Sequence, residues 1–161
     1  MIDLLIEKIH TNPEISKIAL REFNNWLCSD KNDGKNIFRA SFLLLEILQT
    51  SPLLAKDILH TLNLTFKYNK WISYSLLINI IHVDVTLVDD AFLLIKKYFT
   101  LHCDEGELVC LYKMLGMLVD KKQFLALKTV NLIIYLAELD SNGDYSRHQA
   151  NLIINFIKTY I

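Results

Sequence analysis

One stretch of this sequence occurs twice, and it limits the possible folds more than any other feature. Residues Leu4–Pro13 align with Leu43–Pro52, thirty-nine positions later, and the alignment keeps a glutamate, a threonine and the proline. It continues to Lys17, which aligns with Lys56. Within each copy the apolar residues are three and four positions apart, as on one face of an α-helix. Recurrence at this distance indicates stacked supersecondary units, none of which can bury its apolar face alone.

Two weaker copies follow along the chain. The third begins at Leu76–Asp84 and the fourth near Leu111–Val119, so the spacing falls to thirty-three and then to about thirty-five residues. In every copy a second helix follows the first, and its apolar residues recur at matching positions. The predicted core positions of the second helices are Ala19, Leu20, Phe23 and Leu27; Ile58, Leu59, Leu62 and Phe66; Ala91, Phe92, Ile95 and Phe99; and Ala126, Leu127, Val130 and Ile134.

Helical periodicity extends over nearly the whole chain. Four glycines and two prolines are few for 161 residues, which favours long helices over a turn-rich β fold. Short polar segments separate the periodic ones. We expect nine helices, at residues 2–11, 13–28, 36–50, 52–67, 70–82, 85–99, 105–118, 121–138 and 146–160.

This helix-pair repeat resembles the HEAT and armadillo families of helical repeats, and its irregular spacing is nearer to HEAT. The resemblance covers most of the chain and rests on period and pattern. It implies an all-α fold in a single domain, 1–161, built as a short α-solenoid of about four helix pairs. In such solenoids the second helices line an inner surface that binds other macromolecules.

A rival architecture is a compact helical bundle, such as the Bcl-2-like folds used by viral inhibitors that bind host signalling proteins. The low glycine and proline content and the richness in isoleucine, asparagine and lysine also suit a small viral protein. The repeat separates the two interpretations, since a bundle gives no reason for Leu4–Pro13 to recur at Leu43–Pro52. A fully buried central helix without repeat symmetry would favour the bundle.

Several predicted helices begin with capping-box spacing, in which two side chains satisfy otherwise unpaired amides. The pairs are Asp104 with Glu107, Asp120 with Gln123, and Ser146 with Gln149. The last helix carries Leu152, Ile153, Phe156 and Ile157, an apolar face that is rich for the end of a repeat array. We therefore expect that the array continues, that this end meets a partner, or that it mediates self-association.

A mostly polar stripe follows the second helices on the side opposite to the predicted core. Its members are Lys17, Arg21 and Asn24; Lys56, His60 and Asn63; Asp89, Leu93 and Lys96; and Phe124, Lys128 and Asn131. Positions i, i+4 and i+7 share one helix face, so the stripes are expected to form one mildly basic ribbon. Asn24, Asn63 and Asn131 form a column that resembles the asparagine ladder of peptide-binding armadillo proteins, although Lys96 interrupts it and no tryptophan precedes each asparagine.

From these features we expect a protein–protein interaction module or scaffold subunit that binds a peptide or helix of a partner. The predicted partner-binding residues are Lys17, Arg21, Asn24, Lys56, His60, Asn63, Lys96, Lys128 and Asn131. The same lysines would contact phosphates if the ribbon bound nucleic acid. The net charge of −1 disfavours that alternative, because a phosphate-dominated binder carries a basic excess.

Sequence motifs for chemistry are lacking, so we expect no enzymatic activity, cofactor or metal. Asp140, Asn142 and Asp144 imitate the start of a calcium loop, but Tyr145 replaces its glycine. His102, Cys103 and Cys110 are too few ligands to define a zinc site. The three cysteines are expected to be reduced and mostly packed, which, without a signal peptide or a membrane-spanning run, indicates a cytoplasmic or nuclear protein.

The ribbon hypothesis makes a direct prediction for Lys56 and Asn63, which are about two turns apart on one helix face. Replacing both with alanine is expected to weaken capture of the partner from the native cell while folding is unchanged. Partner capture that is equally strong with the double variant would exclude the ribbon as the contact surface.

Overall fold

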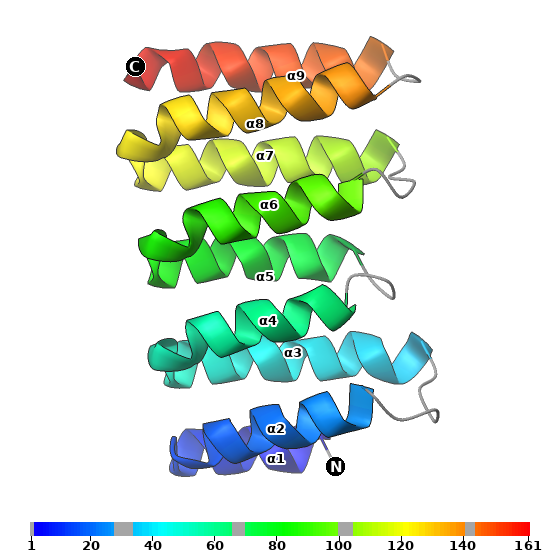
Figure 1. The fold of residues 1–161 in the computed structure, drawn as a ribbon, viewed down its shortest axis with the longest axis vertical. Coiled ribbons are helices and arrows are strands. Elements are labelled where there is room, and N and C mark those ends of the chain that lie inside the picture. Colours follow the sequence, from blue (N-terminus) through cyan, green and yellow to red (C-terminus); the bar gives the residue numbers. More distant parts are fainter. Residues whose placement is uncertain (1, 28–33, 66–69, 100–104, 141–143) are drawn as a thin grey trace. The chain divides into compact units, whose positions relative to one another are not determined.

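The computed structural model describes the backbone of residues 2–27, 34–65, 70–99, 105–140 and 144–161, and the side chains of these residues except 2–3, 34–40, 65 and 70–71. Regular structure in these ranges is entirely helical (Figure 1). The helices are α1 (Ile2–Thr11), α2 (Ile15–Leu27), α3 (Gly34–Thr50), η1 (Pro52–Leu54), α4 (Ala55–Thr65), α5 (Lys70–Val83), η2 (Val85–Leu87), α6 (Val88–Phe99), α7 (Glu105–Lys121), η3 (Gln123–Leu125), α8 (Ala126–Leu139), α9 (Asp144–Ile157) and η4 (Lys158–Tyr160).

The all-α class and the nine α-helices expected from the sequence are confirmed for the described residues. The second helices α4, α6 and α8 are each preceded by a short 3-10 turn, which the sequence analysis had included in the helix. None of the helices in the described ranges has both the length and the apolar character that crossing a membrane requires.

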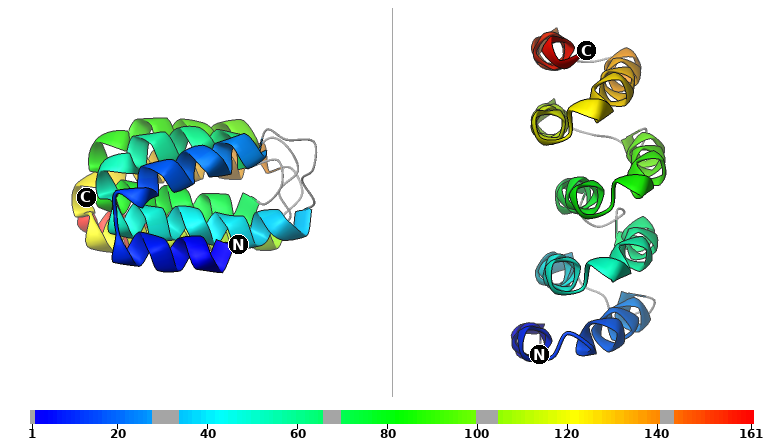
Figure 2. Two further views of the ribbon diagram at one scale, coloured as in Figure 1. Left: turned by 90° about the horizontal axis from the view of Figure 1, so that it is seen from below. Right: turned by 90° about the vertical axis from the view of Figure 1, so that its left-hand side faces the viewer.

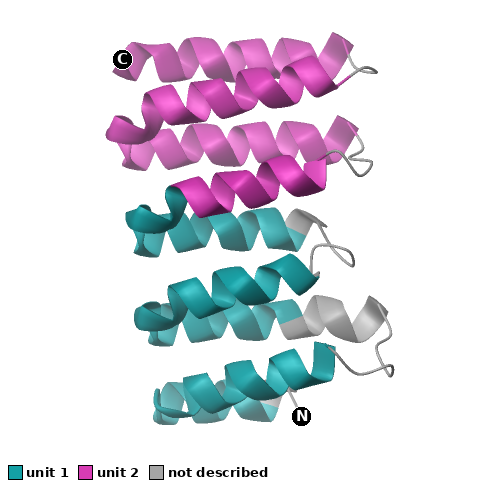
Figure 3. Cartoon of the chain, viewed as in Figure 1, with its two compact units in different colours: residues 1–88 teal, residues 89–161 magenta. Residues whose placement is uncertain are grey.

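The chain divides into two compact units, Met1–Val88 and Asp89–Ile161, hereafter unit 1 and unit 2 (Figure 3). In unit 1, α1, α3 and α5 form one layer and α2 and α4 form a second (Figure 2). In unit 2, α7 and α9 form one layer and α6 and α8 the other (Figure 2). Within unit 1, α3 packs against α1, α2, α4 and α5; within unit 2, α9 packs against α7 and α8. Apolar side chains from both layers make the core of each unit.

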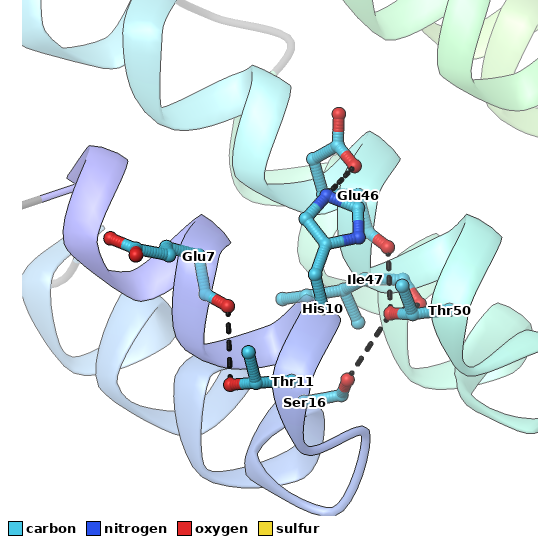
Figure 4. A network of polar contacts seen from close by, with 7 residues as sticks. All are labelled: Glu7, His10, Thr11, Ser16, Glu46, Ile47 and Thr50. Carbon is cyan, nitrogen blue, oxygen red and sulfur yellow. Dashed lines mark hydrogen bonds and ion pairs between the residues drawn. The ribbon is translucent and has the colours of Figure 1, made fainter.

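The first two copies of the repeat have matching side-chain contacts. The Thr11 hydroxyl donates to the backbone carbonyl of Glu7 at 3.3 Å, and the Thr50 hydroxyl donates to that of Glu46 at 2.8 Å (Figure 4). Both threonines therefore close the last turn of their helix in the same way. Matching contacts at these aligned positions give the sequence repeat of unit 1 a structural counterpart.

The same threonine positions differ in their tertiary surroundings. The oxygen of Ser16, which is fully buried, lies 3.4 Å from the Thr50 hydroxyl oxygen (Figure 4). Since the Thr50 proton goes to the Glu46 carbonyl, Ser16 is the donor to Thr50. Nearby, His10 Nε2 and Glu46 Oε2 are 3.0 Å apart and link α1 to α3, and the Ser51 hydroxyl donates to the Pro13 carbonyl at 3.3 Å. These contacts fix how the first helix pair meets the second.

The core face predicted for α8 is shifted by three positions along the sequence from the observed one. Leu127 and Ile134 were expected in the core, but they are 62% and 40% exposed. The buried residues of α8 are Ala126, Thr129, Val130, Leu132, Ile133 and Leu136. The error arises because α7 has 17 residues and α5 has 14, so the turn before α8 comes three residues later than an alignment of the first helices indicates. Aligned at the 3-10 turns, the buried residues Val88, Ala91, Phe92 and Ile95 of α6 match the buried Ala126, Thr129, Val130 and Ile133 of α8.

The apolar face of α9 is split between the interior and the surface. Ile157 is buried, whereas Leu152 is 49% and Phe156 42% exposed. On the inner side α9 approaches α7 closely at Gly116, where a Cβ atom would lie 3.2 Å from Cγ2 of Ile153. Glycine at this position therefore lets the two helices pack without displacing the isoleucine.

Two of the predicted capping boxes are wrong, because tertiary partners use the side chains concerned. Asp120 lies in the last turn of α7 and accepts a hydrogen bond from the Tyr160 hydroxyl at 2.7 Å. Ser146 lies inside α9; its hydroxyl donates to the Asp140 carboxylate, and its backbone N–H donates to Glu105 Oε1 at 3.2 Å. Asp104, of the third pair, lies outside the described residues.

Thr11 and Thr50 give a test of the polar contacts between α1, α2 and α3. Thr50→Val is expected to lower the free energy of unfolding by about 1–2 kcal/mol, because it leaves the buried Ser16 hydroxyl without its acceptor. Thr11→Val removes the equivalent local bond at an exposed site and should cost less than about 0.5 kcal/mol. Chemical denaturation of both variants measures the difference, and equal effects would show that the Ser16 contact is unimportant.

The Tyr160–Asp120 contact predicts a pH dependence of stability. The hydrogen bond to Asp120, with smaller contributions from burial and from the carboxylate charge, raises the pKa of the Tyr160 phenol. The folded state thus holds the phenol proton more tightly than the unfolded state, so the contribution to stability is complete below pH about 10 and is lost as the pH rises through the raised pKa. Denaturation of the native protein and of Tyr160→Phe should differ below this range and converge above it. A difference that is independent of pH would contradict the assignment.

Candidate functional site

A groove in unit 2 runs between α6 and α8 and has a volume of about 270 Å³. Its lining consists of Asp89, Phe92, Leu93, Lys96, Lys128, Asn131 and Leu132. Lys96, Lys128 and Asn131 are predicted partner-binding residues, so the structure brings the unit 2 members of that set together in one place.

An ion pair closes one part of this groove. Lys128 Nζ on α8 donates to both carboxylate oxygens of Asp89 on α6, at 2.6 and 2.7 Å. Both side chains are exposed, so the pair adds little to stability, in the range of about 0–1 kcal/mol. Its effect on the groove is electrostatic, because the charge of Lys128 is already balanced before any partner arrives.

Lys96 is in a different situation from Lys128. Its ammonium nitrogen lies over the ring of Tyr135, 4.9 Å from the ring centroid, in a cation–π contact. Among the side chains that the structure describes, no carboxylate forms an ion pair with it. Within the described part of the chain, the positive charge of Lys96 therefore meets an aromatic ring and no carboxylate.

Large apolar side chains are exposed beside the groove. Phe124 in η3 is 69% exposed, Leu127 and Ile134 on α8 are 62% and 40% exposed, and Leu93 on α6 is 64% exposed. We call Phe124, Leu127, Asn131 and Ile134 the α8 ridge. Exposed apolar surface with a polar rim is typical of a protein contact site.

A second groove flanks the α8 ridge on the side of α9, with a volume of about 410 Å³. It is lined by Ile134, Ala137, Glu138, Arg147, Asn151 and Ile154. The Arg147 guanidinium donates to the backbone carbonyl of Asp140 at 2.8 Å, which fixes its position at the end of this groove. Of the ridge residues, Asn131 lines the first groove and Ile134 lines the second.

The remaining predicted partner-binding residues are in unit 1. Lys17, Arg21 and Asn24 are on α2, and Lys56, His60 and Asn63 are on α4, which packs against α2. The lysines, Arg21 and His60 are exposed, whereas both asparagines are half-buried. Arg21 pairs with Glu22 at 3.5 Å, and Asn24 Oδ1 is buried without a hydrogen-bond partner. The exposed members of this set are therefore all polar.

The predicted asparagine column is wrong in the fourth repeat, at Asn131. With the second helices aligned at their 3-10 turns, Ile134 corresponds to Asn24 and Asn63, and Asn131 corresponds to Arg21 and His60. Asn131 still lies in the α6–α8 groove. Sequence reasoning missed Leu127 and Ile134 as surface residues; the signal that identifies them is the polar break Lys121–Gln123, which marks where the second helix starts.

Metal-binding and cysteine chemistry receive no support from the described side chains. Within them, no group of three or more histidine, cysteine, aspartate or glutamate residues is arranged to hold a metal ion. Cys110 is exposed rather than packed, contrary to expectation. His102, Cys103 and Asn142, which the sequence analysis considered as ligands, lie outside the described residues, as does Cys28.

Comparison of the chain with protein-family models, with curated proteins and with solved structures gave no match.

Proposed function

We propose that this chain is a protein-binding module whose main contact surface is the α8 ridge with the grooves beside it. In this proposal the helix pairs form a HEAT- or armadillo-like array, and a peptide or helix of the partner binds to the second helices of unit 2. The polar face of α2 and α4 in unit 1 provides a further contact, as expected from the sequence.

The exposure of the α8 ridge is the observation that carries this proposal. Phe124 in η3 and Leu127 in α8 are each more than 60% exposed, although both are large apolar residues. Covering such side chains contributes about 1.5–3 kcal/mol each when burial is complete. A partner that covers the ridge therefore gains more from it than from the lysines around it, since exposed charges contribute little.

The polar groups at the site suit recognition of another polypeptide. Asn131 offers an amide that both donates and accepts, which matches backbone or side-chain amides of a partner. Lys96 offers a positive charge held in a fixed position by Tyr135. Apolar anchors with a few oriented polar groups are the usual composition of a protein interface.

Substitution at Leu127 tests the proposal, with Leu53 as the matched control. Leu53 lies in η1 of unit 1 and is 98% exposed, so Leu53→Asp makes the same chemical change away from the ridge. Peptides selected from a random display library on the native chain are expected to bind Leu127→Asp at least about tenfold more weakly, the loss expected for one buried leucine. Their affinity for Leu53→Asp should be unchanged.

Thermal denaturation of both variants controls for folding, because an exposed leucine contributes little to stability. If the selected peptides bind both variants equally well, or if selection enriches no peptide, the α8 ridge is not a protein-binding surface.

A further inference from the structure

We infer that the segment bound on the α8 ridge is a single amphipathic α-helix of a partner protein, with an acidic side chain on its α6 side. This inference rests on the proposed function and specifies the conformation and the charge of the partner. It follows from the spacing of the ridge residues, from the grooves on both sides and from the distribution of charge.

The spacing of the ridge residues is that of a coiled-coil seam. Phe124, Leu127, Asn131 and Ile134 are separated by three, four and three positions. Leu127, Asn131 and Ile134 lie on α8 with the alternation of a and d positions in a heptad repeat, and Phe124 precedes them in η3. Another helix with the same spacing can pack its side chains between those of Leu127, Asn131 and Ile134, whereas the two-residue period of an extended peptide does not match this spacing.

The grooves supply the space that such packing requires. The α6–α8 groove lies beside Asn131 and the α8–α9 groove beside Ile134, with volumes of about 270 and 410 Å³. Helices pack by placing the ridges of one into the grooves of the other. A partner helix on the α8 ridge would place its flanking side chains in the two grooves.

Asn131 sets a requirement at the middle of the seam. It lies between Leu127 and Ile134, so a partner helix that covers these apolar residues also covers its amide. A covered amide that faces only apolar groups loses its hydrogen bonds to water without replacement. A polar residue at one a position is known to fix register and partner choice in coiled coils. The partner is therefore expected to present asparagine or glutamine opposite Asn131.

The charges on the two sides of the ridge determine the orientation of the partner. On the α9 side, Glu138 and Arg147 are one of each sign and leave the groove balanced. On the α6 side, Asp89 balances Lys128, and Lys96 remains without a carboxylate among the described side chains. The excess positive charge is thus confined to the α6 side. A glutamate or aspartate of the partner complements it there.

Two display libraries of equal peptide length distinguish this inference from the proposed function. The first contains helix-forming peptides with a heptad seam in which the seam and flanking positions vary. The second contains peptides interrupted by proline at every fifth position, which prevents a continuous helix. Selection on the full chain is expected to enrich the helical library, with asparagine or glutamine at one seam position and an acidic residue on one flank.

Two variants then assign the contacts. With Lys96→Gln, the preference for the acidic over the neutral peptide is expected to fall by about three- to tenfold, as for the loss of one charge-assisted contact. Lys113→Gln, an exposed lysine on α7, removes the same charge away from the ridge and should preserve the preference. Peptides selected on the Asn131→Leu variant should carry leucine in place of the polar seam residue.

The outcomes separate the two levels of the proposal. Enrichment of the proline-interrupted library alone, abolished by Leu127→Asp, overturns the helical partner and leaves the protein-binding function standing. Enrichment of neither library overturns both. Sedimentation showing that the free chain forms dimers which Leu127→Asp dissociates would assign the ridge to a second copy and overturn the inference of a different partner.

Discussion

Several helices in this chain bury their apolar faces against more than one neighbour, and this constraint determines how the helices within each unit are arranged. In unit 1, α3 buries Leu43, Leu44, Ile47 and Leu48 while it packs against helices on both sides and in the other layer. The polar contacts at the joint, such as the one between Ser16 and Thr50, are few. Apolar burial therefore holds the helices together, and the polar contacts select the register in which they meet.

The helices could be predicted from the sequence because their periodicity is strong and the breaks are short and polar. The register of α8 could not be, since leucine and isoleucine occur on nearly all sides of this helix and the longer α7 displaces the turn before it. The capping pairs at Asp120 and Ser146 failed for a different reason. The Asp120 side chain bonds to Tyr160 and the Ser146 backbone N–H bonds to Glu105, each about forty positions away, and local spacing contains no information about such contacts.

The candidate site was predicted in part. The sequence placed Lys96, Lys128 and Asn131 in one stripe that crosses two second helices, and they do line one groove. It could not show that Asp89 balances Lys128, because that pair joins two helices, nor that a ring rather than a carboxylate faces Lys96. It also assigned Leu127 to the core, where its chemistry would ordinarily place it. The site is consequently more apolar and less basic than the ribbon expected from the sequence.

The exposed α8 ridge also has a consequence for the lifetime of the protein in a cell. Chaperones and proteases recognise contiguous apolar side chains, which ordinarily become accessible only when a protein unfolds. A folded chain that displays Phe124 and Leu127 presents such side chains permanently. Quality control would then act on the unoccupied form, and a partner that covers the ridge would determine how much of the protein accumulates.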